Sequence, residues 1–279
     1  MCGIIGYIGE KEAGPILLEG LKKLEYRGYD SAGFCLLNSE GLKVIKKKGK
    51  ISEFDGLKDL EASSANIGIA HTRWATHGEP NEINAHPHSD CKGNISIVHN
   101  GIIENHASLR KLLESQGHVM KSETDSEVLA HLIEKFYKGN LEDAILLALK
   151  VVEGTYGLAV LSKNENKICV ARRGSPLLIG VGEGEFFVSS DATAILNHTK
   201  KVVYLNDNEV AVITKEGFFV KNFEGEDMHP EVHEIKWNVE QIEKKGFKHF
   251  MLKEIFEQPE SLANGFRGRV KDGKIKSSI

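Results

Sequence analysis

Short apolar strands on both sides of a helical block are the feature that most restricts the fold of this chain. Before the block, strands are expected at 3–8, 32–37, 42–46, 67–71 and 95–99, with an amphipathic helix at 16–24. After it, strands broken by turns are expected at 156–161, 168–172, 177–181, 186–189, 202–205, 210–213 and 218–220. Mixed strands around a helical block predict an α+β domain with stacked sheets.

The block between the strands predicts three helices. Apolar residues recur at helical spacing from Leu109 to Leu113, from Val128 to Phe136 and from Leu141 to Ala148. The second helix is preceded by the sequence Thr-Asp-Ser-Glu, which predicts a capping box between Thr124 and Glu127.

The chain changes character near residue 238. Residues 1–238 hold both strand blocks and are expected to form one domain. Residues 239–279 are polar and charged, with helical spacing around Phe250 and Ile255, and they end in a glycine-rich basic stretch. This composition predicts a C-terminal helix followed by the start of a linker.

Charge and hydropathy restrict the partners and the compartment. The formal net charge is −4, which gives no electrostatic reason to expect a nucleic acid or an anionic membrane as partner. No apolar run is long enough to cross a bilayer, and the first residues lack the features of a signal peptide. We therefore expect a cytoplasmic protein. The basic cluster Lys46–Lys48 is interpreted as a solvated strand end.

Cysteines and histidines raise the question of a metal site. The cysteines lack C-x-x-C spacing, so the sequence indicates neither a disulfide framework nor a cysteine zinc site. They are Cys2, Cys35, Cys91 and Cys169. The histidines that crowd 71–99 match no recognisable zinc pattern, and histidines hydrogen-bonded to the backbone are the commoner case. No metal and no cofactor are expected, and a histidine-ligated metal protein is the alternative.

Cys2 is the first candidate for chemistry. Removal of Met1 would leave a cysteine whose free α-amine has a pKa of about 7.7–8.0, so part of it is an unprotonated base at neutral pH. This amine can accept the proton of its own thiol, so that one residue supplies both nucleophile and base. A buried structural cysteine is the alternative, which the position alone favours.

The segments at 25–33 and 70–78 carry further candidates. Arg27 and Asp30 stand among glycines between a helix and a strand, where they could brace a neighbouring turn or simply pair with each other. Arg73 follows a strand and could grip a carboxylate with two hydrogen bonds. Thr76 and His77 could add hydrogen bonds, and Trp74 could cover the site. The alternative is a surface salt bridge for Arg73, with Trp74 as an ordinary core residue.

Asn100 and Asp125 complete the candidates that the residues themselves suggest. Asn100-Gly101 stands where a strand is expected to end, so a plain hairpin turn is a serious alternative. In the functional interpretation, the Asn100 amide and the Gly101 N–H point at one oxygen and form an oxyanion hole. Asp125, at the start of a helix, could compensate the helix dipole or bind the ammonium group of an amino acid.

Together these segments resemble the class II glutamine amidotransferases, which belong to the N-terminal nucleophile hydrolases. The resemblance covers essentially the whole chain, and motifs that are weak alone are specific because they follow in the family's order. They are Met1-Cys2-Gly3-Ile4, Tyr26–Gly33, His71–Gly78, Asn84–His88, His99–Asn105 and Glu123-Thr124-Asp125. Within the class, Tyr26–Gly33 and Arg73–Gly78 are most similar to the enzymes that make glucosamine 6-phosphate from glutamine and fructose 6-phosphate.

The resemblance implies a four-layer αββα sandwich of two antiparallel sheets and a set of residue roles. Cys2 would attack the side-chain amide of L-glutamine and form a thioester, with its α-amine as base and Asn100 and Gly101 as oxyanion donors. The glutamine carboxylate would be held by Arg73, Thr76 and His77, and its ammonium by Asp125. Trp74 would gate ammonia passage. The segment that shapes the surroundings of the nucleophile would be Arg27, Gly28, Tyr29 and Asp30.

The resemblance also implies a partner beyond this chain. The similar enzymes carry a C-terminal sugar-phosphate isomerase domain that binds fructose 6-phosphate, accepts the ammonia and could mediate a homodimer. This chain would perform the glutaminase half-reaction of amino sugar biosynthesis, without a cofactor. The alternatives are the glutaminase domain of a purine-pathway amidotransferase and a non-catalytic glutamine-binding regulatory domain. The latter would lose Cys2 or Asn100, and both are present.

Overall fold

The computed structural model describes residues 2–53, 60, 63–236, 247, 250–266, 270–271 and 274–275. The chain divides into two compact units, Met1–Lys236 and Trp237–Ile279. The expectation that residues 239–279 begin a linker to a further domain stays a prediction. Within the described residues, no helix is both long and apolar enough to span a membrane.

The described residues of the first unit form a sheet of eight strands, here called sheet A. All of its neighbouring strands pair antiparallel, in the order β15-β11-β9-β10-β1-β4-β2-β3. The strands are β1 Gly3–Ile8, β2 Ser31–Asn38, β3 Gly41–Lys48, β4 Ile67–Arg73, β9 Leu178–Val181, β10 Phe186–Ser189, β11 Lys201–Tyr204 and β15 His233–Glu234. β1 and β4 lie toward the middle and are buried along their whole length, which explains the continuous apolar sequence of β1.

Sheet B is the second antiparallel sheet, with seven strands among the described residues in the order β14-β13-β12-β8-β7-β6-β5. The strands are β5 His88–Ser89, β6 Ile95–Ile103, β7 Gly154–Ser162, β8 Glu165–Arg173, β12 Glu209–Ile213, β13 Phe218–Asn222 and β14 Asp227–Met228. The short strands β5, β14 and β15 were not expected from the sequence, because two residues carry no periodicity.

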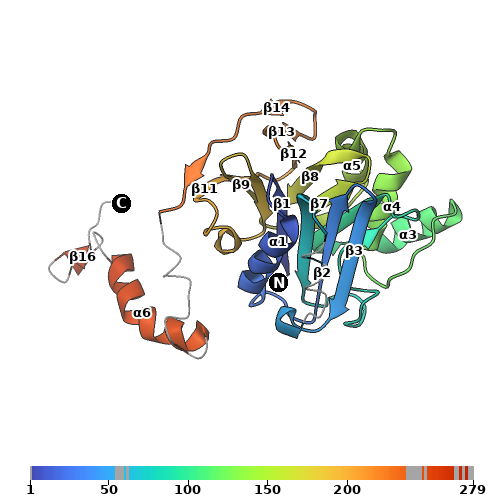
Figure 1. The fold of residues 1–279 in the computed structure, drawn as a ribbon. Coiled ribbons are helices and arrows are strands. Elements are labelled where there is room, and N and C mark those ends of the chain that lie inside the picture. The colour runs from blue at the N-terminus through green and yellow to red at the C-terminus, as the bar shows by residue number, and fades with distance from the viewer. Residues whose placement is uncertain are drawn as a thin grey trace. The chain divides into compact units, whose positions relative to one another are not determined.

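Helices cover the outer faces of the two sheets (Figure 1). α1 (Ala13–Leu24) packs on sheet A through Leu17, Leu21 and Leu24, which recur at helical spacing. α3 (His106–Ser115), α4 (Glu127–Phe136) and α5 (Leu141–Leu149) cover sheet B. α5 begins after Asn140, whose side chain accepts the N–H groups of Glu142 and Asp143.

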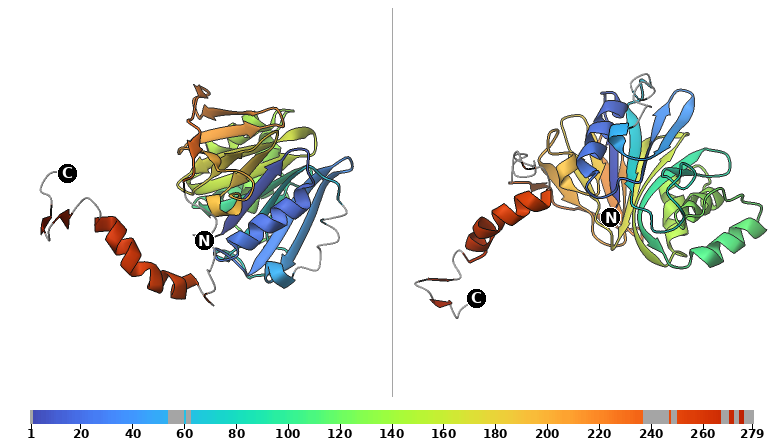
Figure 2. Two further views of the ribbon diagram at one scale, coloured as in Figure 1. Left: turned by 60° about the vertical axis from the view of Figure 1, so that its left-hand side comes forward. Right: turned by 90° about the horizontal axis from the view of Figure 1, so that it is seen from below.

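Figure 2 shows the layers of the first unit from two further sides. Apolar cores, of which two are described here, hold these layers together. One lies between the sheets and includes Ile4, Ile69, Val98 and Val170. The other lies between sheet B and the helices, where Leu132 and Ile145 are buried. The order helix, sheet, sheet, helices is the αββα sandwich that the resemblance implied, so the fold prediction is confirmed.

Several local expectations were wrong in detail. β6 continues through Asn100-Gly101 to Ile103, because this dipeptide pairs with β7 across Gly157 and Tyr156 and so does not form a turn. Only half of the capping box forms. Thr124 Oγ1 accepts the Glu127 N–H at 3.3 Å, whereas the Glu127 carboxylate accepts the N–H groups of Lys121 and Ser122.

The second unit is described by α6 (Phe250–Phe266) and a hairpin of β16 (Val270–Lys271) with β17 (Lys274–Ile275). α6 continues past Pro259. The helical spacing around Phe250 and Ile255 therefore indicated the helix but not its length.

Shortening Leu17 to alanine should destabilise the first unit by about 2–5 kcal/mol, because Leu17 is fully buried between α1 and sheet A. The same change at Leu112, which is 44% exposed, should cost less than about 1 kcal/mol. Urea unfolding of both variants beside the wild type measures the difference. Equal losses would show that α1 does not depend on this contact.

Candidate active site

A cavity of about 250 Å³ opens where β1, β4, β6 and the start of α4 meet. Cys2 precedes β1, Arg73 ends β4, Asn100 and Gly101 lie in β6, and Asp125 precedes α4. The cavity is lined by Cys2, Arg27, Arg73, Trp74, Thr76, His77, His86, His99, Asn100, Gly101, Ile102, Thr124, Asp125, Ser126, Thr155, Ser175 and Pro176. Most candidates from the sequence thus lie around one space.

Cys2 lies against the chain that leaves β4. Among the described residues, Cys2 Sγ forms hydrogen bonds with the backbone of Trp74. The Trp74 N–H donates to the sulfur at 3.2 Å, and the thiol faces the Trp74 carbonyl oxygen at 3.6 Å. Burial raises the pKa of the Cys2 thiol, although the Trp74 hydrogen bond acts in the opposite sense. The thiol is therefore protonated at neutral pH and needs a base before it can attack.

His71 fixes the orientation of the Asn100 amide. The Asn100 Nδ2 donates to the Cys2 carbonyl oxygen at 3.1 Å, while its Oδ1 lies 3.0 Å from His71 Nε2. The same His71 nitrogen lies 3.1 Å from the His99 carbonyl oxygen. Because both of its neighbours are acceptors, Nε2 carries the proton. His71 thereby turns the Asn100 N–H groups toward Cys2.

Gly101 has a backbone that other residues rarely adopt. Its φ is +138°, and a Cβ at this position would lie 2.1 Å from the Thr155 carbonyl oxygen. A side chain would therefore strain the backbone and push β6 away from β7. Glycine is required here for the shape of the strand beside Asn100.

Part of the Arg73 guanidinium donates hydrogen bonds to the loop that follows β4. Its Nη atoms donate to the backbone carbonyl oxygens of His77, Gly78 and Glu79. Arg73 is 3% exposed, and burial lowers its pKa while Asp30, Cys2 and Asp125 oppose the shift. A guanidinium has five N–H donors, so some remain for a ligand.

Asp125 also has a backbone partner. Its Oδ2 accepts the Ile103 N–H at 2.8 Å, and its Oδ1 accepts the Ser126 hydroxyl at 3.3 Å. Ser126 Oγ in turn lies 2.8 Å from His99 Nδ1. The carboxylate is 3% exposed and is fixed at the cavity wall between β6 and α4.

Of the segment 27–30, only Arg27 lines the cavity. Arg27 pairs with Asp191 at 2.8 Å, and not with Asp30 as one interpretation had it. Asp30 instead accepts the Ala75 N–H. A Cβ on Gly28 would lie 2.7 Å from the Arg73 carbonyl carbon, so this glycine allows the segment to pack on β4. Tyr29 contacts the Trp74 ring edge-on at 5.6 Å between centroids.

The interpretation of the basic cluster as a solvated strand end is wrong for Lys46. Its Nζ donates to the carbonyl oxygens of Ile83 and Ala85, and burial lowers its pKa to about 8. Lys46 therefore holds the long loop between β4 and β5 onto sheet A. The spacing of the lysines gave no sign of this, because the loop carbonyls come from a distant part of the sequence.

Some cavity residues were not among the candidates from the sequence. Thr155, Ser175 and Pro176 reach the cavity from β7 and from the chain after β8. No sequence motif indicated these residues, because they form part of the cavity wall without contributing a charged group. The buried histidines gave a partial signal as a crowded segment. Three of the rings are in contact: the His86 ring lies 4.1 Å from the His71 ring and 4.5 Å from the His88 ring, between centroids.

Burial keeps these histidines uncharged. It lowers the pKa of His71 to about 3, and it lowers the pKa values of His86, His88 and His99 below their ordinary value. A neutral imidazole with so low a pKa is a poor acceptor of a proton at neutral pH. These groups therefore suit orientation and packing better than acid–base chemistry.

Sequence comparison places the chain among known proteins. A family model described as a glutamine amidotransferase domain matches residues 56–249. The glutamine–fructose-6-phosphate aminotransferase (isomerizing) of Chlorobaculum tepidum is 54% identical over 285 residues, covering 99% of this chain and 46% of the relative. The protein of the same name from Thermotoga maritima is 50% identical over 276 residues, with 98% and 45% covered. The chain spans about half the length of the curated relatives it matches.

Solved structures resemble the fold as well. The glutamine phosphoribosylpyrophosphate amidotransferase of B. subtilis, complexed with ADP and GMP, aligns with a TM-score of 0.70 and 29% identity. A structure described as the allosteric regulatory enzyme of purine biosynthesis aligns with a TM-score of 0.71 and 30% identity. Each of the two alignments covers 80% of this chain and 49% of the solved chain. These neighbours agree with the two-sheet sandwich described above.

The buried neutral histidines should make the protein sensitive to mild acid. The folded pKa of His71 is about 3 and the ordinary value is 6.5, so its contribution to stability is complete above pH 6.5. It is lost as the pH falls from 6.5 toward 3, because only the unfolded chain takes up the proton. Between pH 7.5 and 5.5 this histidine alone should cost about 1 kcal/mol of unfolding free energy.

Urea unfolding at both pH values measures this loss. In His71→Gln the pH-dependent loss should be smaller by about 1 kcal/mol, since glutamine does not titrate. His229→Gln, at an exposed position, should behave as the wild type. An unchanged pH dependence in His71→Gln would contradict the assignment of a neutral His71.

Proposed function

The chain belongs to the family of class II glutamine amidotransferase domains, and on that premise we propose that it hydrolyses L-glutamine to glutamate and ammonia through a thioester on Cys2. The observation that carries the proposal is the cavity in which Cys2 and Asn100 lie near a buried cation, Arg73, and a buried anion, Asp125. A free amino acid is a zwitterion, and a site with both charges suits it.

The thiol proton goes to the α-amine of Cys2 in this proposal. The Cys2 pKa is raised by burial, so a base is required, and the low pKa values of His71, His86 and His99 make these rings weak candidates. The amine, exposed by removal of Met1, accepts the proton as the sulfur attacks the amide carbon. It returns the proton to the leaving nitrogen, ammonia departs, and water hydrolyses the thioester to glutamate.

Asn100 and Gly101 stabilise the negative oxygen that forms during the attack. A carboxamide has two N–H donors, and in Asn100 one of them reaches the Cys2 carbonyl oxygen. The other is proposed to donate to the oxyanion together with the Gly101 N–H. His71 is a positioning residue, because it holds the Asn100 oxygen on the far side.

Arg73 and Asp125 bind the two ends of glutamine. The remaining donors of Arg73, with Thr76 and His77, hold the carboxylate, and Asp125 holds the ammonium. The bonds from Arg73 to the loop carbonyls of 77–79 give it a second effect, since they also shape the loop that contributes Thr76. Binding and loop geometry are therefore coupled through one side chain.

The released ammonia is proposed to serve glucosamine 6-phosphate synthesis from fructose 6-phosphate in the cytoplasm. The relatives that are 54% and 50% identical bear the corresponding name, and this chain covers less than half of each. The acceptor sugar phosphate and any dimer contact would then belong to an isomerase domain outside this chain. Trp74 is half-exposed and lies beside Cys2, and we propose that it gates the ammonia. The alternative is that the ammonia serves purine synthesis. The solved structures that favour this alternative are less similar to the chain, at 29–30% sequence identity.

Activity should require a free amine on Cys2. Retention of Met1 or of an N-terminal tag turns this amine into an amide, which cannot accept a proton, so the protein should fold and release no ammonia. Proteolytic exposure of Cys2, verified by mass, should restore turnover. An alkylating glutamine analogue should then label Cys2 and not Cys35, Cys91 or Cys169. Full activity with a blocked terminus would mean that a side chain is the base.

Asn100 and Arg73 should give different kinetic patterns. Asn100→Ala should lower kcat by about 10²–10³ with little change in KM, the usual loss for one oxyanion donor. Arg73→Ala should raise KM by about 10- to 100-fold, because a charged hydrogen-bond partner of the substrate is lost. Asn164→Ala, in the exposed turn between β7 and β8, is the control and should match the wild type. The same pattern in both site variants would contradict the division of roles.

A further inference from the structure

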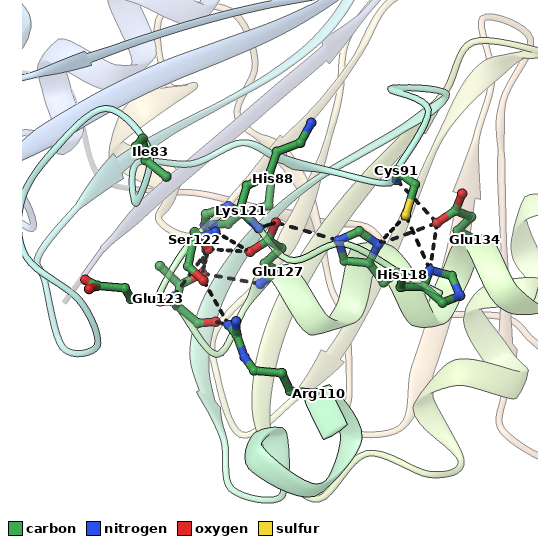
Figure 3. A network of polar contacts seen from close by, with 12 residues as sticks. Ile83, His88, Cys91, Arg110, His118, Lys121, Ser122, Glu123, Glu127 and Glu134 are labelled. Atoms are coloured by element: carbon green, nitrogen blue, oxygen red, sulfur yellow. Dashed lines mark hydrogen bonds and ion pairs between the residues drawn. The ribbon is translucent and has the colours of Figure 1, made fainter. Parts of the chain in front are cut away.

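A cluster of four potential metal ligands lies outside the cavity of the proposed glutaminase site. Cys91 lies in the turn between β5 and β6, His118 follows α3, and His131 and Glu134 lie one turn apart on α4. None of these residues lines the cavity that holds Cys2. Figure 3 shows Cys91, His118 and Glu134 pointing toward one another. We call these four residues the Cys91 cluster.

The ligand atoms of the Cys91 cluster are close together. The Cys91 sulfur lies 3.6 Å from His118 Nδ1 and 3.4 Å from His131 Nδ1. Glu134 Oε2 lies 3.0 Å from His118 Nδ1 and 3.5 Å from His131 Nδ1. All four atoms lie within 4.8 Å of one another. Bonds of 2.0–2.3 Å at tetrahedral angles would separate zinc ligands by about 3.3–3.6 Å.

The surroundings of His131 match those of a metal-bound histidine. Its Nδ1 faces the cluster, and its Nε2 lies 3.6 Å from the carboxylate of Glu127. Histidine ligands commonly face a carboxylate with the second nitrogen, which fixes the ring. The His131 side chain is 1% exposed, whereas those of His118 and Glu134 are 13% and 19% exposed. An ion can therefore enter from the solvent and bind to a fixed inner histidine.

We propose that the Cys91 cluster binds one Zn²⁺ ion as a structural site. One thiolate, one carboxylate and two neutral imidazoles carry two negative charges, which balance the ion. This mixture of sulfur, nitrogen and oxygen donors in a tetrahedron suits zinc better than Mg²⁺ or Ca²⁺, which prefer oxygen ligands. Binding releases the thiol proton of Cys91 to solvent. All four positions are filled by protein, as in structural zinc sites.

The position of the Cys91 cluster gives the ion a structural role. It would join the turn before β6, the segment after α3 and the middle of α4. β6 carries Asn100 and Gly101, and α4 begins two residues after Asp125. The ion would therefore stabilise the elements behind the cavity without touching the substrate. An ion that binds the folded chain and not the unfolded one raises the unfolding temperature.

The test uses the Cys2→Ala chain, so that the thiol proposed as nucleophile cannot bind zinc. After incubation with Zn²⁺ and removal of the excess, elemental analysis should find about one zinc per chain. Cys91→Ala in this background should retain less than about a tenth of that amount. Cys35→Ala, the matched change at a cysteine in the core between the sheets, should retain all of it. His118→Gln should lose zinc and His229→Gln should not.

Two further measurements keep the outcome decisive. Co²⁺ in the same chain should give the intense visible bands of a tetrahedral ion and a sulfur charge-transfer band, both absent in Cys91→Ala. Zn²⁺ should raise the unfolding temperature of the Cys2→Ala chain and not that of His118→Gln, with circular dichroism verifying that both are folded. Failure of the parent chain to retain zinc would overturn the proposal, and so would zinc retention by folded Cys91→Ala. The cluster would then be a hydrogen-bonded group alone.

Discussion

The antiparallel pairing of β1 with β4 is the interaction on which the rest of the site depends. Its register sets Gly3 opposite Thr72, which brings Cys2 beside the end of β4, at Arg73 and the following Trp74. A shift of one residue would turn every side chain of β1 to the other face of the sheet. A Cβ at Gly3 would lie 2.7 Å from Leu24 Cβ of α1, so a shift that placed a larger residue at this position would produce a clash. The core therefore fixes the place of the nucleophile.

His71 extends this control from one sheet to the other. It lies on β4 of sheet A, and its ring donates to Asn100 on β6 of sheet B. A buried hydrogen bond of this kind must be made by a neutral ring, since a charged imidazole without a counterion would be costly there. The fold meets this requirement by burial, which lowers the His71 pKa to about 3. Orientation of the proposed oxyanion donor is thus a consequence of how the sheets stack.

Arg73 and Lys46 show why loop positions need the tertiary structure. Both cations donate to backbone carbonyl oxygens of the long loop between β4 and β5. From the sequence, Arg73 was expected to hold a carboxylate and Lys46 to be solvated. The periodicity of the chain indicates where strands begin and end, but it says nothing about which carbonyl groups a loop presents to a distant side chain.

The sequence by itself determined the long strands and helices, the α+β class and, through six ordered motifs, the family and the candidates around Cys2. These are properties of neighbouring residues, because periodicity and turn chemistry act over a few positions. Only the tertiary structure decided the β6 path through Gly101, the orientation of Asn100 and the meeting of Cys91 with His118 and α4. Within that cluster, one turn of helix joins His131 to Glu134, and the other partners come from separate segments. Such contacts follow from strand register and sheet stacking, which no local pattern contains.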